Sequence, residues 1–275
     1  MNDLESACRA AAHLLSQADG LMITAGAGMG VDSGLPDFRG DEGFWKAYPM
    51  LGELGISFAE MANPRHFASD PAIGWGFYGH RLQLYRATPP HAGFARLQEF
   101  AARLEHGAFV FTSNVDGHFQ KAGFAAGRIV ECHGSIHHLQ CMEQCGQPIW
   151  QADAFAPEID HAKCRLTSGP PRCPNCGALA RPNILMFGDW DWDESRARGQ
   201  LANLQAWIDK VTRLVVIELG AGTAVATVRA FSERLNCPLI RINPTDCDVP
   251  KADDVSVAAR ALAGIEGLAA ALAQR

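Results

Sequence analysis

Short apolar runs of strand length alternate with helix-length segments along most of this chain, and this alternation constrains its fold most strongly. The strand-length runs occupy residues 21–24, 109–112, 128–132, 184–187, 214–219, 239–243 and 255–258. The helix-length segments include 3–18, 193–210 and 224–236. Short apolar strands that alternate with helices are typical of α/β domains with a parallel sheet. We therefore predict an α/β fold built on such a sheet.

Two segments interrupt this alternation. Residues 36–85 are rich in Gly, Pro, Phe and Trp, and residues 137–183 hold five of the nine cysteines. Chain excursions from strand ends are where α/β folds build binding sites. We therefore predict that the two insertions, 36–85 and 137–183, form a smaller lobe. The remaining parts, 1–35, 86–136 and 184–275, would form the sheet domain.

Composition excludes several classes of protein. The chain has 275 residues and a net charge of −6, which argues against a broadly basic surface, so we expect no nucleic-acid partner. No apolar run reaches the roughly 18–20 residues that a membrane span needs, so we expect no membrane association. The first ten residues lack the apolar core of a signal peptide, which favours a cytoplasmic protein. The sequence does not indicate the oligomeric state.

Four cysteines form two close pairs. Cys141 and Cys145 are followed, after 27 intervening residues, by Cys173 and Cys176. Each close pair can supply two ligands from one turn, and two pairs complete a closed tetrahedral zinc site. We therefore predict one structural zinc ion per chain. Cys164 lies between the pairs and is an alternative ligand, and four free thiols are the alternative to a metal site.

A glycine-rich turn, Gly26-Ala27-Gly28, follows the first strand-length run. Glycine lets a pyrophosphate approach the backbone closely. The usual dinucleotide fingerprint is incomplete, however, because Val31 stands at its third glycine position and Lys46 at the acidic position about 20 residues on. On these glycines alone, a tight turn between a strand and a helix is an equally good interpretation.

The longer string over 26–40, GAGMGVDSGLPDFRG, resembles the GAGxSxxSGIPDFRG signature of the sirtuin family, with Gly30 in place of its Ser. Residues 112–117 resemble the family's TQN(I/V)DG segment, with Ser113 in place of Gln. Further resemblances occur at 131–135 to ELHGS, at 181–189 to RPxVVxFGE, at 220–223 to a second nucleotide turn and at 241–243 to a late strand end.

The resemblance implies a Rossmann-like domain, a small zinc lobe and NAD⁺ consumed as a co-substrate between them. It implies an NAD-dependent protein-lysine deacylase that acts on acylated lysine in proteins or peptides. His133 would be the general base, with Asn114 and Asp116 as further catalytic residues. The implied NAD contacts are Gly26, Ala27, Gly28, Asp37, Phe38, Arg39, Ser113, Asn114, Asp116, Gly222, Thr223 and Asn243. The implied substrate segment comprises Ile184, Leu185, Phe187 and Gly188, which would pair with an extended peptide.

Tyr78 and Arg81 resemble the Y-x-x-R pair of the sirtuin subgroup that removes succinyl or malonyl groups. An Arg fork and a phenol can hold a carboxylate through charge-assisted hydrogen bonds. An amphipathic helix with a solvated Arg81 is the structural alternative. The acyl group is therefore open between acetyl and an acidic acyl such as succinyl or malonyl.

The departures at Gly30 and Ser113 leave other activities open. An NAD glycohydrolase or an ADP-ribosyltransferase on the same fold is one alternative. A non-catalytic NAD-sensing module is a second alternative, but the presence of His133, Asn114 and Asp116 disfavours it because sensing needs no base.

Overall fold

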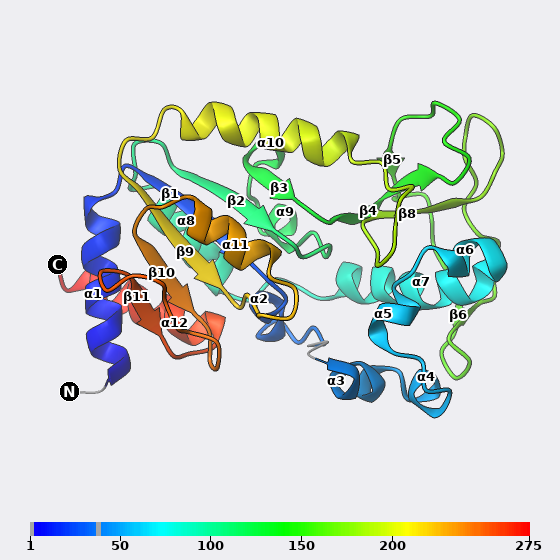
Figure 1. Cartoon of the computed structure of the whole chain (residues 1–275), viewed down its shortest axis with the longest axis horizontal. Coiled ribbons are helices and arrows are strands. Elements are labelled where there is room, and N and C mark those ends of the chain that lie inside the picture. The colour runs from blue at the N-terminus through cyan, green and yellow to red at the C-terminus, as the bar shows by residue number, and fades with distance from the viewer. Residues whose placement is uncertain (1–2, 37–39) are drawn as a thin grey trace.

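The computed structural model describes residues 3–36 and 40–275 (Figure 1). The helices are α1 (Asp3–Gln17), α2 (Gly28–Val31), α3 (Gly40–Ala47), α4 (Pro49–Glu53), α5 (Phe58–Met61), α6 (Arg65–Ser69), α7 (Pro71–Ala87), α8 (Gly93–Ala101), α9 (His118–Lys121), η1 (Ala126–Arg128), α10 (Ser195–Ile208), α11 (Thr227–Arg234) and α12 (Ala261–Ala273). The strands are β1 (Gly20–Ala25), β2 (Ala108–Thr112), β3 (Ile129–Glu131), β4 (Gly134–Cys141), β5 (Trp150–Gln151), β6 (Ile159–Asp160), β7 (Arg165–Leu166), β8 (Ala180–Ile184), β9 (Leu214–Leu219), β10 (Leu239–Ile242) and β11 (Val255–Val257).

Six strands form a parallel sheet in the order β11-β10-β9-β1-β2-β3. Alternate residues of a strand face opposite sides of a sheet. Leu21 and Ile23 of β1 accordingly pack in one core with α1, α8 and α12, and Met22 packs in another with α10 and α11. Figure 1 shows these helices as layers on the two faces of the sheet. The predicted α/β fold with a parallel sheet is therefore confirmed.

A second core lies beside this sheet domain. It joins buried side chains of α3 to α7, among them Phe44, Trp75 and Phe77, to residues of β4 and β8. The strands β5, β4 and β8 form a small antiparallel sheet, and β6 pairs with β7. We call this part of the molecule the small lobe. The part of 36–85 that the structure describes is helical, without a strand.

The domain boundaries inferred from the sequence stay a prediction. The breaks placed after residues 85, 136 and 183 fall inside α7, β4 and β8. Segment 137–183 also contains more regular structure than its Pro and Gly content indicates. Only a turn at Cys132 and His133 separates β3 of the parallel sheet from β4. The strands β4 and β8 then pair from Gly134 to Cys141, with a register irregularity between Ser135 and Leu139.

The strand expected at 184–187 is placed differently. The structure has β8 at Ala180–Ile184, and the chain leaves the β4 ladder after Ile184. The Leu185 amide donates to the carbonyl of His133 (2.9 Å), and the Phe187 amide donates to the carbonyl of Ala62 (2.9 Å). The segment is thus held by two different parts of the chain. None of the described helices is both long and apolar enough to span a membrane.

Candidate active site

Two glycine turns meet at the carboxyl edge of the parallel sheet. β1 and β9 are neighbours, and the amide of Gly28 after β1 donates to the carbonyl of Gly220 after β9 (3.0 Å). A Cβ on Gly220 would lie 2.5 Å from the Gly28 backbone, and Gly220 has φ +58°. A Cβ on Gly26 would lie 2.8 Å from the backbone of Ala221. Glycine is therefore required here because the turns touch each other.

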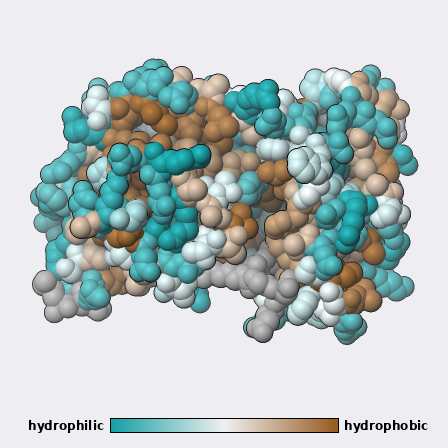
Figure 2. All heavy atoms as spheres, viewed as in Figure 1, coloured by the Kyte–Doolittle hydropathy of each residue, from teal (hydrophilic) through white to brown (hydrophobic). Residues whose placement is uncertain are grey.

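A cavity of about 610 Å³ opens at this edge, between the sheet domain and the small lobe. The space-filling view shows the surface hollowed between the two parts (Figure 2). Its volume falls within the range of roughly 300–1,000 Å³ that is usual for ligand pockets. The site residues predicted from the sequence that line it are Gly26, Ala27, Gly28, Arg81, Ser113, Asn114, Asp116, His133, Ile184, Leu185, Phe187, Gly222 and Thr223.

Three predicted site residues lie away from the cavity lining. Tyr78 is 1% exposed and packs in the core of the small lobe. Asn243 is buried, and its amide donates to the carbonyl of Ala221 (2.9 Å), so it shapes the second glycine turn from behind. Gly188 follows Phe187 with φ +67°. Asp37, Phe38 and Arg39 lie outside the described residues, so their assignment stays a prediction.

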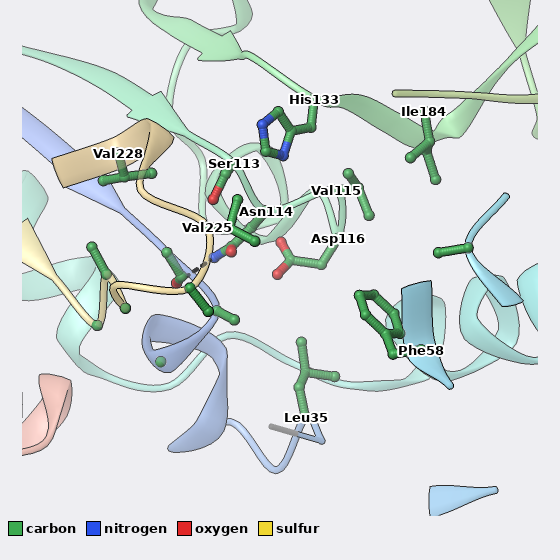
Figure 3. Close-up of a pocket in the computed structure, with 18 of the residues that line it drawn as sticks. Leu35, Phe58, Ser113, Asn114, Val115, Asp116, His133, Ile184, Val225 and Val228 are labelled. Carbon is green, nitrogen blue, oxygen red and sulfur yellow. Dashed lines mark hydrogen bonds between the residues drawn. The ribbon is translucent and has the colours of Figure 1, made fainter. Parts of the chain in front are cut away.

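Asn114 and Asp116 belong to the loop after β2. The Asn114 side-chain amide donates to the carbonyl of Gly26 (2.9 Å), which ties this loop to the first glycine turn. The Asp116 carboxylate accepts the backbone N–H of His118 (2.9 Å). Burial raises the pKa of Asp116, and the His118 amide and the nearby His137 and Arg81 oppose that rise. In Figure 3 the Asp116 carboxyl group lies between Asn114 and Phe58.

His133 follows β3, the edge strand of the sheet. Figure 3 shows its imidazole on the side of the cavity where Ser113 lies. Burial lowers the pKa of His133, so the ring is neutral at neutral pH and can accept a proton. The backbone carbonyl of this residue accepts the amide of Leu185, which joins it to the predicted substrate segment.

Arg81 and Tyr85 form a buried pair at the small-lobe wall of the cavity. The Arg81 guanidinium donates to the Tyr85 hydroxyl from Nε (3.0 Å) and from Nη2 (2.6 Å). The guanidinium carbon also lies 5.3 Å from the Phe77 ring centroid and 5.6 Å from that of Tyr78. Tyr85 was not among the predicted site residues, although its spacing of four residues from Arg81 on α7 places both on one helix face.

Much of the remaining lining is apolar. These residues were not predicted as site residues, although several of them lie inside the motifs at 26–40, 112–117, 181–189 and 220–223, because apolar side chains carry no chemical signal of their own. They are Leu35, Pro36, Phe58, Ala62, Val115, Met186, Gly220, Ala221, Ala224, Val225 and Val228, together with the acidic Asp246.

The four predicted zinc ligands come together in the small lobe. The sulfurs of Cys141, Cys145, Cys173 and Cys176 lie within 4.8 Å of one another. The Cys141–Cys176 and Cys145–Cys173 sulfur pairs are 3.6 and 3.5 Å apart. Four thiolates about 2.3 Å from a tetrahedral zinc ion would be about 3.8 Å apart, so the cluster fits this metal. Cys164 lies outside the cluster, in the core of the small lobe.

Proteins of similar sequence show which family this chain resembles. The Sir2 family model matches residues 26–221. An NAD-dependent protein deacylase 2 from Pyrobaculum aerophilum is 31% identical over 252 residues, which cover 91% of this chain and 90% of the relative. An NAD-dependent protein deacylase from Corynebacterium glutamicum is 27% identical over 278 residues, covering 97% of this chain and 98% of the relative.

Solved structures of similar fold agree with these sequence matches. A Sir2 homologue mutant in complex with ADP-ribose has a TM-score of 0.70 at 23% identity, covering 100% of this chain and 97% of the other. A complex of a Sir2 homologue with NAD has a TM-score of 0.69 at 22% identity, covering 96% and 93%. At this identity the likeness shows the fold. Because the family model matches more than half of its residues, this chain belongs to the Sir2 family.

Proposed function

We propose that this protein is an NAD-dependent protein-lysine deacylase, which converts an acylated lysine, NAD⁺ and water into free lysine, nicotinamide and O-acyl-ADP-ribose. One observation carries the proposal. A neutral imidazole at His133 faces the same cavity as Asn114, Asp116 and both glycine turns. The names of the relatives, NAD-dependent protein deacylases, support it.

We assign the binding site for the NAD⁺ phosphates to the two glycine turns. Close contact between Gly26 and Ala221 builds one continuous backbone surface. A Cβ on Gly222 would meet open space, so the second turn faces the cavity without crowding it. Such turns let a pyrophosphate approach main-chain amides closely. When bound, NAD⁺ supplies the ADP-ribosyl group, with nicotinamide as the leaving group.

In this proposal, His133 takes a proton from a ribose hydroxyl and thereby prepares its oxygen to attack the acyl carbon. Asn114 and Asp116 line the part of the cavity that we assign to nicotinamide. The bond from Asn114 to Gly26 holds the amide in one orientation against the first glycine turn. Burial of Asp116 raises the pKa of its carboxyl group, and the His118 amide, His137 and Arg81 oppose that rise.

Activity should persist to lower pH than an ordinary histidine allows. The base acts only when neutral, and burial lowers the pKa of His133 below its usual value of about 6.5. We therefore expect the acid limb of kcat/KM to fall at a pH below about 6.5. A pH–rate profile with saturating NAD⁺ measures this limb. An acid limb centred above 6.5 would contradict the role of a buried neutral base.

The substrate peptide is assigned to the edge formed by residues 184–187. Leu185 and Phe187 direct their amides to the protein, and alternate residues of an extended segment face opposite edges. On the opposite edge, the Met186 amide donates to the Asp189 carboxylate (3.3 Å), so the Met186 carbonyl is the main-chain group that we assign to pairing with a peptide. The side chains of Leu185 and Phe187 are 37% and 44% exposed, which is consistent with apolar contacts to a substrate.

We assign the acyl group to the wall that Arg81 and Tyr85 form, which favours an acidic acyl chain. We expect Arg81→Met to lower kcat/KM for a succinyl-lysine peptide about 10- to 100-fold, because a charge-assisted hydrogen bond is lost. Activity on the matching acetyl-lysine peptide should change much less, which also reports correct folding. Arg103→Met removes an exposed arginine outside the cavity and is the control. Equal losses on both peptides would contradict the assignment.

Product analysis tests the proposed function as a whole. The protein is incubated with NAD⁺, with and without an acylated peptide, and the products are separated by mass spectrometry. Acyl-ADP-ribose that forms only with peptide supports a deacylase. Free ADP-ribose without peptide would indicate an NAD glycohydrolase, and a peptide that carries ADP-ribose would indicate a transferase. The small Ser113 side chain in the cavity wall favours hydrolysis as the second candidate, because it leaves more room for water.

A further inference from the structure

His91 connects the first glycine turn to the helix that begins beside it. This residue is 9% exposed and lies in the loop between α7 and α8. The Gly93 amide donates to His91 Nδ1 (3.0 Å), and His91 Nε2 lies 3.0 Å from the carbonyl oxygen of Met29. The backbone amide of His91 donates to the Ser33 hydroxyl (2.9 Å). These contacts span the segment from Met29 to Ser33.

The contacts fix the proton on the ring. A nitrogen that accepts a backbone N–H carries no proton of its own, so Nδ1 of His91 is unprotonated. In the neutral ring the proton is then on Nε2, which donates it to the carbonyl of Met29. His91 therefore works as a neutral bridge with one acceptor and one donor.

Met29 lies in α2, directly after the turn assigned to the phosphates. Its amide donates to the carbonyl of Gly26 (3.0 Å), and the preceding amide of Gly28 contacts Gly220. A displacement of the Met29 carbonyl would therefore move the turn itself. His91 does not line the cavity, so it acts on the ligand through this turn and not by contact.

We propose that His91 is a positioning residue, which holds the first glycine turn in the geometry that binds NAD⁺. This inference rests on the proposed function, because it assumes that the turn receives the nucleotide. It adds a residue from a loop that carries none of the motifs by which the cavity was predicted. The positioning depends on Nε2, which holds Met29, while Nδ1 joins the ring to Gly93 at the start of α8.

Protonation would break this bridge. A second proton on Nδ1 would point at the Gly93 N–H, so two donors would face each other. Burial lowers the pKa of His91, the hydrogen bond to the Met29 carbonyl and the nearby Asp32 oppose this shift, and His118 adds to it. This repulsion would push the ring away from Met29, so the contact with Met29 is intact at neutral pH and is lost on strong acidification.

Two substitutions separate the two ring nitrogens. His91→Asn places an amide oxygen near Nδ1, so it retains the acceptor for Gly93 but does not reach Met29. His91→Gln places an amide nitrogen near Nε2, so it retains the donor to Met29. We expect Asn to raise the Kd for NAD⁺ about two- to tenfold, the effect of one lost hydrogen bond, and to raise KM while leaving kcat nearly unchanged. Gln should bind NAD⁺ within about twofold of the unchanged protein.

Calorimetry of NAD⁺ binding to the full chain measures both variants, with the Tm of each as a check on folding. If Asn binds NAD⁺ as tightly as the unchanged protein, the positioning role is overturned. A loss of kcat without a change in KM also overturns it. If the unchanged protein binds no NAD⁺, the proposed function fails first, which is a different result.

A pH series covers the case in which the Asn variant does not fold. The affinity of the unchanged protein for NAD⁺ should fall on acidification more steeply than that of His91→Gln, which has no titrating ring at this position. The other histidines are present in both proteins, so their titration contributes equally to the two pH profiles. Parallel pH profiles for the two proteins would overturn the proposal.

Discussion

Replacement of His133 by alanine should lower deacylation turnover by roughly 10²–10⁴-fold while NAD⁺ still binds. The variant removes the imidazole that accepts the ribose proton, but it leaves the glycine turns unchanged. The carbonyl of residue 133 that accepts the Leu185 amide also remains, because it belongs to the backbone. Steady-state release of deacylated peptide measures turnover, and calorimetry measures NAD⁺ affinity.

His161→Ala is the matched control, since it removes an exposed histidine of the small lobe that does not line the cavity. It should retain turnover close to that of the unchanged protein. Full activity of His133→Ala would exclude this residue as the base. Loss of NAD⁺ binding together with turnover would instead show that the imidazole mainly supports the nucleotide site.

Replacement of Cys173 by serine should remove the zinc ion and unfold the small lobe. The apparent binding free energy of structural zinc in small modules is about 10–16 kcal/mol, comparable with the entire stability of a typical domain. Cys141 ends β4, so loss of the cluster also releases the strand that pairs with β8 and leads to the substrate segment. Peptide turnover should therefore disappear together with the metal.

Elemental analysis of zinc and thermal unfolding with and without a chelator measure this effect. Cys247→Ser, outside the cluster and in the sheet domain, is the control and should keep one zinc ion per chain. A full complement of zinc in Cys173→Ser would show that another residue completes the site. An unchanged Tm after complete removal of zinc would contradict a structural role for the metal.

Much of this architecture could be predicted because its signals are local. Alternating apolar runs predicted the parallel sheet, since each strand buried on both faces must be apolar along its length. The close spacing within each cysteine pair predicted the cluster, since two ligands on one turn need little help from the rest of the fold. The residues around Gly26, Asn114 and His133 were predicted from motifs that directly follow strands.

The cavity wall formed by Arg81 and Tyr85 could not be predicted from local sequence alone. Tyr78 and Tyr85 both lie near Arg81 on α7, one three residues before it and the other four residues after it. Either spacing places a phenol on the same helix face as the guanidinium. Packing of Tyr78 against Phe67, whose ring centroid is 5.6 Å away, directs it into the core and leaves Tyr85 at the cavity. Which of the two tyrosines reaches the cavity therefore depends on a contact between α7 and α6, which the sequence of α7 alone does not reveal.

The hydrogen bond from Leu185 to the carbonyl of His133 has a consequence for how this protein can evolve. The segment that we assign to the substrate and the residue that we assign to proton transfer share one anchoring point. A substitution that shifts Leu185 to suit a different peptide also shifts the backbone from which the imidazole projects. A single substitution in this segment should therefore change both the preferred substrate sequence and the reaction rate, so selection on one property also alters the other.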